Sequence, residues 1–175
     1  MKILVISDSH GSYDKIISTI RKNSKAEIIA FCGDGHSDIE EAKKYFPDKM
    51  FLAVRGNCDW CCDFPYLTDI NLCGRKMIVT HGHLQRVKEG YSILRDFAKG
   101  INADIALFGH THSPYLDYDG RVLIMNPGSL GYNNEYGILD IAEDGSLKAA
   151  LYPKNKYNPP ICLKAKESVI TKKDV

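Results

Sequence analysis

The sequence predicts an α/β fold, and three observations lead to that prediction. Apolar, β-branched segments alternate with amphipathic helical segments in the first part of the chain. Each of these apolar segments stops abruptly at a short polar turn. From Tyr115 the pattern changes to short strands paired across Asp-Gly turns. Strand–turn–helix alternation is typical of parallel strands with covering helices, and the later hairpins are expected to extend a second sheet.

Size, charge and composition describe an ordinary globular protein. The chain has 175 residues and a net charge of +1. We expect one domain over 1–175, with 153–175 as a partly ordered tail that carries no function. The charge indicates neither a nucleic-acid partner nor a membrane, and no apolar run approaches the roughly 20 residues of a membrane helix. The N-terminus resembles no signal peptide, so we expect a cytoplasmic protein with reduced cysteines.

The first half alternates strands and helices. The predicted strands cover 2–7, 27–32 and 50–54. Ser12 is expected to cap a helix over 13–23, where Ile16, Ile17 and Ile20 recur at helical spacing. A second helix is predicted over 38–46, which leaves His36 as an exposed loop residue.

A hairpin and another strand–helix pair follow. Residues 69–73 and 76–80 flank a predicted turn at Gly74-Arg75. A helix is expected over 87–99, with Gly100 at its C-terminal end. The elements expected after it are strands over 103–108, 115–118, 121–125, 136–141 and 146–152.

Potential metal ligands stand where the apolar strands end. Asp8 and His10 follow the first strand, Asp34 the second and Asn57 the third, while histidines 81, 83, 110 and 112 follow two later strands. Each motif alone reads equally well as a turn or a helix start. Because the carboxyl ends of parallel strands meet at one edge, the full set predicts a metal site there.

The types of ligand indicate the ion. Two carboxylates, one amide and four histidines suit Mn²⁺, Fe²⁺ or Zn²⁺ better than Ca²⁺, which prefers oxygen. Seven ligands exceed what one ion needs and fit two ions that share a carboxylate. Such a pair binds a phosphoryl group and supplies hydroxide near neutral pH.

Five ordered motifs carry a family resemblance: Asp-x-His, Gly-Asp, Gly-Asn-x-Asp, His-Gly-His and Gly-His-Thr-His. Between Ile3 and Ser129 the chain resembles the calcineurin-like metallophosphoesterases, and its short length and Asn-Pro-Gly-Ser loop resemble their small YfcE-like or MJ0936-like phosphodiesterase group. The resemblance implies a four-layer α/β/β/α sandwich of two mixed β-sheets flanked by helices.

The resemblance also implies a ligand assignment. Asp34 bridges two ions and His83 lies behind the direct ligands. The ligands of the first ion are Asp8, His10 and His112, and those of the second are Asn57, His81 and His110.

The predicted catalytic residues are Asn57, Cys58 and Asp59. Most of the superfamily has a histidine where this chain has Cys58. A thiol with an ordinary pKa of about 8.5 is a poorer proton donor to a leaving alkoxide. We therefore expect activity on activated phosphodiesters, with Asp59 either orienting Cys58 or serving only as a turn carboxylate.

The predicted function is a metal-dependent phosphodiesterase that attacks phosphorus with a metal-bound hydroxide. We expect Mn²⁺, with iron, zinc and nickel as alternatives, and a small phosphodiester substrate. One alternative is a phosphomonoesterase or nucleotidase. Another is a protein-binding scaffold without catalysis, because the group is related to a retromer subunit. An exposed strand edge also leaves a homodimer open.

Overall fold

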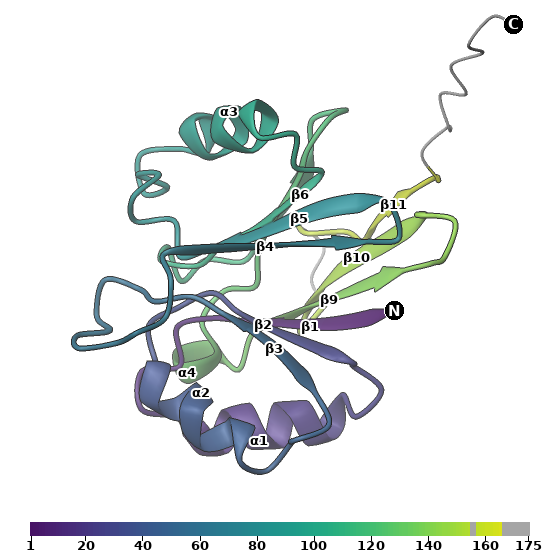
Figure 1. Cartoon of the computed structure of the whole chain (residues 1–175). Coiled ribbons are helices and arrows are strands. Elements are labelled where there is room, and N and C mark those ends of the chain that lie inside the picture. The colour runs from purple at the N-terminus through teal and green to yellow at the C-terminus, as the bar shows by residue number, and fades with distance from the viewer. Residues whose placement is uncertain (155–156, 166–175) are drawn as a thin grey trace, which may run out of the picture.

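The computed structural model describes residues 1–154 and 157–165. Its main feature is a pair of β-sheets stacked face to face, with helices on the outer sides (Figure 1). The strands are β1 (Lys2–Ile6), β2 (Ile28–Phe31), β3 (Met50–Ala53), β4 (Leu67–Leu72), β5 (Arg75–Thr80), β6 (Ile105–Leu107), β7 (Tyr115–Tyr118), β8 (Leu123–Asn126), β9 (Tyr136–Ile141), β10 (Leu147–Tyr152) and β11 (Ile161–Leu163). The helices are α1 (Tyr13–Lys22), α2 (His36–Lys43), α3 (Ser92–Gly100) and α4 (Leu130–Asn133).

Both sheets are mixed. The first has the strand order β11-β10-β9-β1-β2-β3, and the second has the order β4-β5-β6-β8-β7. Strands β1, β2 and β3 run parallel, as do β5, β6 and β8, while the remaining pairs are antiparallel. The carboxyl ends of the parallel strands carry the ligand motifs, as the sequence predicted.

Alternation along the strands builds the layers. In β1, Ile3 and Val5 belong to the core between the two sheets, whereas Leu4 and Ile6 pack toward α1 and α2. In β5, Ile78 packs with the α3 side of the second sheet. Because successive side chains point to opposite faces of a strand, each strand serves two apolar layers. The predicted four-layer α/β/β/α arrangement is confirmed.

Two predicted helices have different limits. Helix α2 begins at His36 rather than 38 and ends at Lys43, so the prediction of a loop histidine at position 36 was wrong. Helix α3 begins at Ser92 rather than 87. Gly90 has a φ of +136°, a conformation outside the helical region, and this separates residues 87–90 from the helix. The Ser12 hydroxyl makes no capping hydrogen bond to α1.

The hairpins also differ from expectation. The β4–β5 turn is Cys73-Gly74, one residue earlier than predicted, and both residues have positive φ. The β9–β10 hairpin joins β1 in the first sheet instead of extending the second. In the described part of the tail, residues 161–163 form β11 on β10. The rest of the predicted tail, 155–156 and 166–175, lies outside the described residues.

Within the described residues, no helix is long and apolar enough to cross a membrane.

Candidate metal centre

The seven predicted ligands gather in loops at one edge of the two sheets. The loops are tied to one another by backbone hydrogen bonds: Asp8 N donates to Gly33 O at 2.9 Å, and Gly109 N donates to His81 O at 3.1 Å. The first bond joins the loop after β1 to that after β2, and the second joins the loops after β5 and β6. Side chains from both sheets therefore face a common space.

The first group of donors is Asp8, His10 and His112. The Nε2 atoms of the two histidines lie 3.2 Å apart, and Asp8 Oδ1 lies 3.1 Å from His112 Nε2. Asp8 Oδ1 is buried and makes no hydrogen bond within the described residues. Ligand atoms about 2.1 Å from a common ion lie roughly 3 Å from each other, so this group fits a divalent ion.

A second group surrounds His81. Its Nε2 lies 3.1 Å from Asn57 Oδ1 and 3.3 Å from Asp34 Oδ2. A carboxylate oxygen of Asp34 lies within 4.8 Å of donor atoms of Asp8 and His10 in the first group and of His81 in the second. The carboxylate of Asp34 thus lies between the two groups of ligands.

The surroundings of His81 present the correct nitrogen to a metal. His81 is fully buried, and its Nδ1 lies 2.6 Å from the carbonyl oxygen of Cys32. A carbonyl oxygen can only accept, so Nδ1 carries the proton and Nε2 faces Asn57 and Asp34 with its lone pair. This is the usual arrangement behind a metal-binding imidazole.

The backbone at the ligands is in a conformation that is uncommon for residues with side chains. Five of the seven predicted ligands have a left-handed backbone, with φ from +45° at His10 to +69° at His110. Such residues are disfavoured by about 1–3 kcal/mol each, and they concentrate at functional sites. The five are Asp8, His10, Asp34, His110 and His112.

Charge affects the histidines unequally. Burial, together with repulsion from His81 when that imidazole is protonated, lowers the pKa of His110 to about 4. The Asp8 carboxylate, whose Oδ1 lies 3.1 Å from His112 Nε2, raises the pKa of His112. Burial opposes protonation of His81, but the carboxylates of Asp34 and Asp8 outweigh it and raise the pKa of His81. His110 is therefore held neutral, while His81 and His112 lie against anionic oxygens that a cation would also attract.

Asp59 is hydrogen-bonded to the backbone of two loops. Its two oxygens accept backbone hydrogen bonds at 2.8–2.9 Å from Gly56, Asp34, Gly35 and His36. These hydrogen bonds agree with the interpretation of Asp59 as a turn carboxylate. His36 Nδ1 also lies 3.3 Å from Asp59 Oδ1, so His36 is part of this network rather than a free surface residue.

Cys58 and His83 lie beside the ligands. The Cys58 side chain is exposed, shares a pocket with His10 and Asp34, and accepts a hydrogen bond from Asn57 Nδ2 at 3.3 Å. The His83 ring centroid lies 5.3 Å from that of His81 and 6.0 Å from that of His110. Cys58 and His83 therefore both lie at the margin of the candidate metal centre.

Three residues near the candidate metal centre were not predicted from the sequence. They are Asn126 and Ser129 of the Asn-Pro-Gly-Ser segment and Tyr132 of α4. Buried Asn126 donates to Gly109 O at 2.8 Å, and buried Ser129 donates to Asp8 O at 2.9 Å, so both hold ligand loops. The Tyr132 ring lies 5.4 Å from the rings of both His10 and His112. Asn126 ends an apolar strand, and the candidate ligands also follow apolar strands. This shared position is the sequence feature that could have identified Asn126.

Comparison with known proteins identifies the family. Residues 1–144 match the model of the calcineurin-like phosphoesterase superfamily domain. The chain belongs to the calcineurin-like phosphoesterase superfamily. This membership makes it a metallophosphoesterase, and the clustered carboxylates and histidines are its candidate metal-binding residues.

Relatives of this superfamily cover most of the chain. The chain is 32% identical over 151 residues to the probable metallophosphoesterase YsnB of Bacillus subtilis, covering 83% of this chain and 88% of YsnB. It is 28% identical over 169 residues to the phosphodiesterase YfcE of Escherichia coli, and the match covers 80% of this chain and 88% of YfcE. A Streptococcus pneumoniae structure described as a predicted phosphoesterase superposes with a TM-score of 0.75 at 27% identity. The superposition covers 93% of this chain and 97% of the other.

Proposed function

We propose that this metallophosphoesterase hydrolyses phosphodiesters with two divalent ions, Mn²⁺ foremost and iron, zinc or nickel as alternatives. The observation that carries the proposal is the place of Asp34 between two groups of nitrogen and oxygen donors. Asp8, His10 and His112 would hold one ion, Asn57, His81 and His110 the other, and Asp34 would bridge them. Two such ions supply Lewis-acid stabilisation of a phosphoryl group and make hydroxide available near neutral pH.

The protein's own residues contribute orientation and a choice of substrate. The Cys32 carbonyl fixes the tautomer of His81, and the Asp59 carboxylate fixes the loop that carries Asn57. Cys58 occupies the exposed position beside Asp34 where an imidazole could protonate a leaving group. A thiol does this poorly, so the proposed substrates are small phosphodiesters with good leaving groups.

The test compares hydrolysis of bis-p-nitrophenyl phosphate and p-nitrophenyl phosphate by metal-stripped protein, with and without added Mn²⁺. Mn²⁺-dependent turnover of the diester, exceeding that of the monoester, is the expected result. Preference for the monoester would support a phosphomonoesterase or nucleotidase instead. Stoichiometric binding of two ions without hydrolysis of either ester would support a scaffold.

A pair of variants tests whether activity depends on the centre. Asp8→Asn removes a carboxylate that faces His10 and His112, and should lose metal stoichiometry and turnover together. Asp14→Asn makes the same chemical change on the exposed first turn of α1 and should leave both unchanged. Equal activity of the two variants would contradict the proposed assignment.

A further inference from the structure

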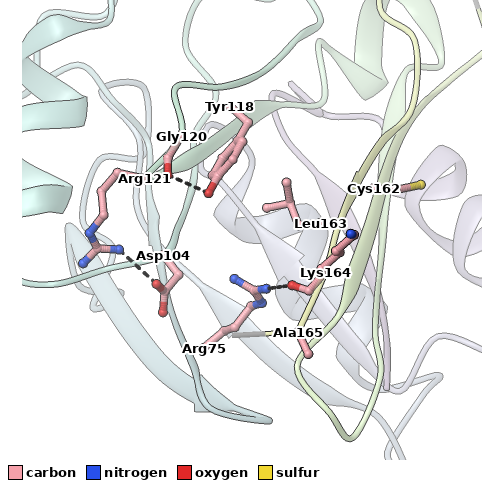
Figure 2. A pocket seen from close by; sticks show the side chains of 9 residues that line it. All are labelled: Arg75, Asp104, Tyr118, Gly120, Arg121, Cys162, Leu163, Lys164 and Ala165. Atoms are coloured by element: carbon pink, nitrogen blue, oxygen red, sulfur yellow. Dashed lines mark hydrogen bonds and ion pairs between the residues drawn. The ribbon is translucent and has the colours of Figure 1, made fainter. Parts of the chain in front are cut away.

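A second polar cavity lies at the opposite end of the second sheet from the metal centre. Strand β5 begins at Arg75 in this cavity and ends next to His81, so its length separates the two sites by roughly 17 Å. The cavity has a volume of about 550 Å³, which is within the range of small-molecule sites. Its walls come from β5, β7 and β11, from Asp104 just before β6, from the β7–β8 turn and from residues 164–165 after β11 (Figure 2).

The central side chain is a buried arginine. Arg75 is 6% exposed, and its guanidinium donates to the carbonyl oxygens of Gly145 and Lys164, the second at 2.7 Å. In the described part of the chain no carboxylate lies within salt-bridge distance of Arg75, and the carboxylate of Asp144 acts on its charge only from farther away. Carbonyl oxygens satisfy donors but do not neutralise the charge, and a buried charge normally has an ionic partner.

The surrounding charges reinforce that of Arg75. Arg121 and Lys164 also line the cavity, and Asp104 is the single carboxylate among the described residues that line it, so the formal net charge of these residues is +2. Arg121 Nη1 donates to Asp104 Oδ1 at 3.0 Å, and the backbone N–H of Lys76 donates to Asp104 Oδ2 at 2.9 Å. The carboxylate is thus already engaged by donors at the cavity wall.

An aromatic ring completes the site. Tyr118 lines the cavity, and its hydroxyl donates to Gly120 O at 2.8 Å, which fixes the ring beside the cations (Figure 2). The guanidinium group of arginine can donate two parallel hydrogen bonds to phosphate oxygens, and an aromatic ring can stack on an organic group. We propose that this cavity, walled by Arg75, Arg121, Lys164 and Tyr118, binds the phosphate group of a small phosphomonoester, separately from the metal centre.

The experiment is an NMR titration of the ¹⁵N-labelled full chain in EDTA at constant ionic strength. Inorganic phosphate, AMP and adenosine are the three probes. Saturable shifts of the Gly120 and Arg121 amides with phosphate and AMP, but not with adenosine, are expected. Because the metal centre can also attract phosphate, shifts at His81 and His110 are followed separately. Shifts confined to those histidines, or binding of adenosine equal to that of AMP, would overturn the proposal.

Variants distinguish a binding site from a purely structural arginine. Arg121→Gln should weaken phosphate binding at Gly120 by at least about tenfold, because it removes a charged donor. Arg121→Lys, which keeps the charge, should stay within a few-fold of the wild type. Arg21→Gln changes an exposed arginine on α1 and is the matched control. Unchanged binding in a folded Arg121→Gln protein would refute the site.

Discussion

Gly56 leaves the space that the carboxylate of Asp34 occupies. A Cβ atom at position 56 would lie 2.0 Å from Asp34 Oδ1 and 2.6 Å from the Asp34 backbone nitrogen. Both distances are far below van der Waals contact, and one of the contacted atoms is backbone. The glycine of the Gly-Asn-x-Asp motif therefore permits the loop after β3 to approach the Asp34 carboxylate closely.

This contact makes Gly56→Ala an informative variant. The added methyl group should displace Asp34 and greatly reduce metal binding and phosphodiesterase activity. Gly100→Ala is the control, because a Cβ there contacts nothing within 4 Å and lies at the end of helix α3. Alanine at position 100 should be neutral or stabilise by up to about 1 kcal/mol. Metal titration by calorimetry and thermal unfolding would measure both effects, and full metal binding by Gly56→Ala would show that the loops adapt.

Asp59→Asn should destabilise the protein even though the side chain keeps its shape. Burial opposes ionisation of Asp59, but the backbone N–H groups of four residues outweigh it and lower the pKa of the carboxyl group. An asparagine offers one acceptor oxygen, and its amide would face N–H groups. We expect a loss of about 3 kcal/mol in the free energy of unfolding. Denaturant unfolding of the metal-free protein measures it, and an unchanged midpoint would mean that Asp59 acts in chemistry only.

The candidate ligands could be selected from the sequence, whereas the residues that support their loops could not. Asp8, Asp34 and His110 stand directly after apolar strands, and this local pattern is visible without a structure. Asn126 and Ser129 contact ligand loops more than 15 residues away in sequence, through hydrogen bonds that no local pattern specifies. Long-range contacts of single polar side chains depend on the assembled fold.

The difference between local patterns and long-range contacts also explains where the fold prediction was wrong. Hydrophobic alternation predicted the β9 and β10 strands, but alternation does not state which sheet a hairpin joins. That choice follows from pairing with β1, where Ile3 faces Leu139. Gly90 was available in the sequence as a helix breaker, and its positive φ is what delays α3.

Cys58→His should broaden the range of leaving groups. The side chain at position 58 is exposed next to Asp34, so an imidazole there would reach the same pocket without burial. A histidine donates a proton near neutral pH, which adds about 10²-fold or more for general acids in favourable cases. We expect a rise in turnover for alkyl diesters and little change for bis-p-nitrophenyl phosphate. Cys58→Ser is the control, and equal effects of both variants on alkyl diesters would contradict the proton-donor explanation.

Tyr132 should contribute to substrate binding rather than to chemistry. Its side chain is 65% exposed while its ring lies beside His10 and His112. An aromatic contact contributes about 0.5–1.5 kcal/mol, so Tyr132→Leu should raise KM for aryl diesters roughly two- to tenfold with kcat nearly unchanged. Tyr132→Phe keeps the ring and should resemble the wild type. If phenylalanine were as harmful as leucine, the hydroxyl group and not the ring would be responsible.

Metal affinity should fall as the pH falls from 8 toward 5, and the histidines should protonate in a defined order. The pKa values of His81 and His112 are raised above 6.5, whereas that of His110 is lowered to about 4. Protonated imidazole has no lone pair for a metal, so protons compete with ions first at His81 and His112 and only later at His110. NMR titration of the ring protons in metal-free protein would give this order directly. Calorimetry at several pH values should show proton release on metal binding that increases below pH 7. An early titration of His110, before His112, would contradict the electrostatic account given for this centre.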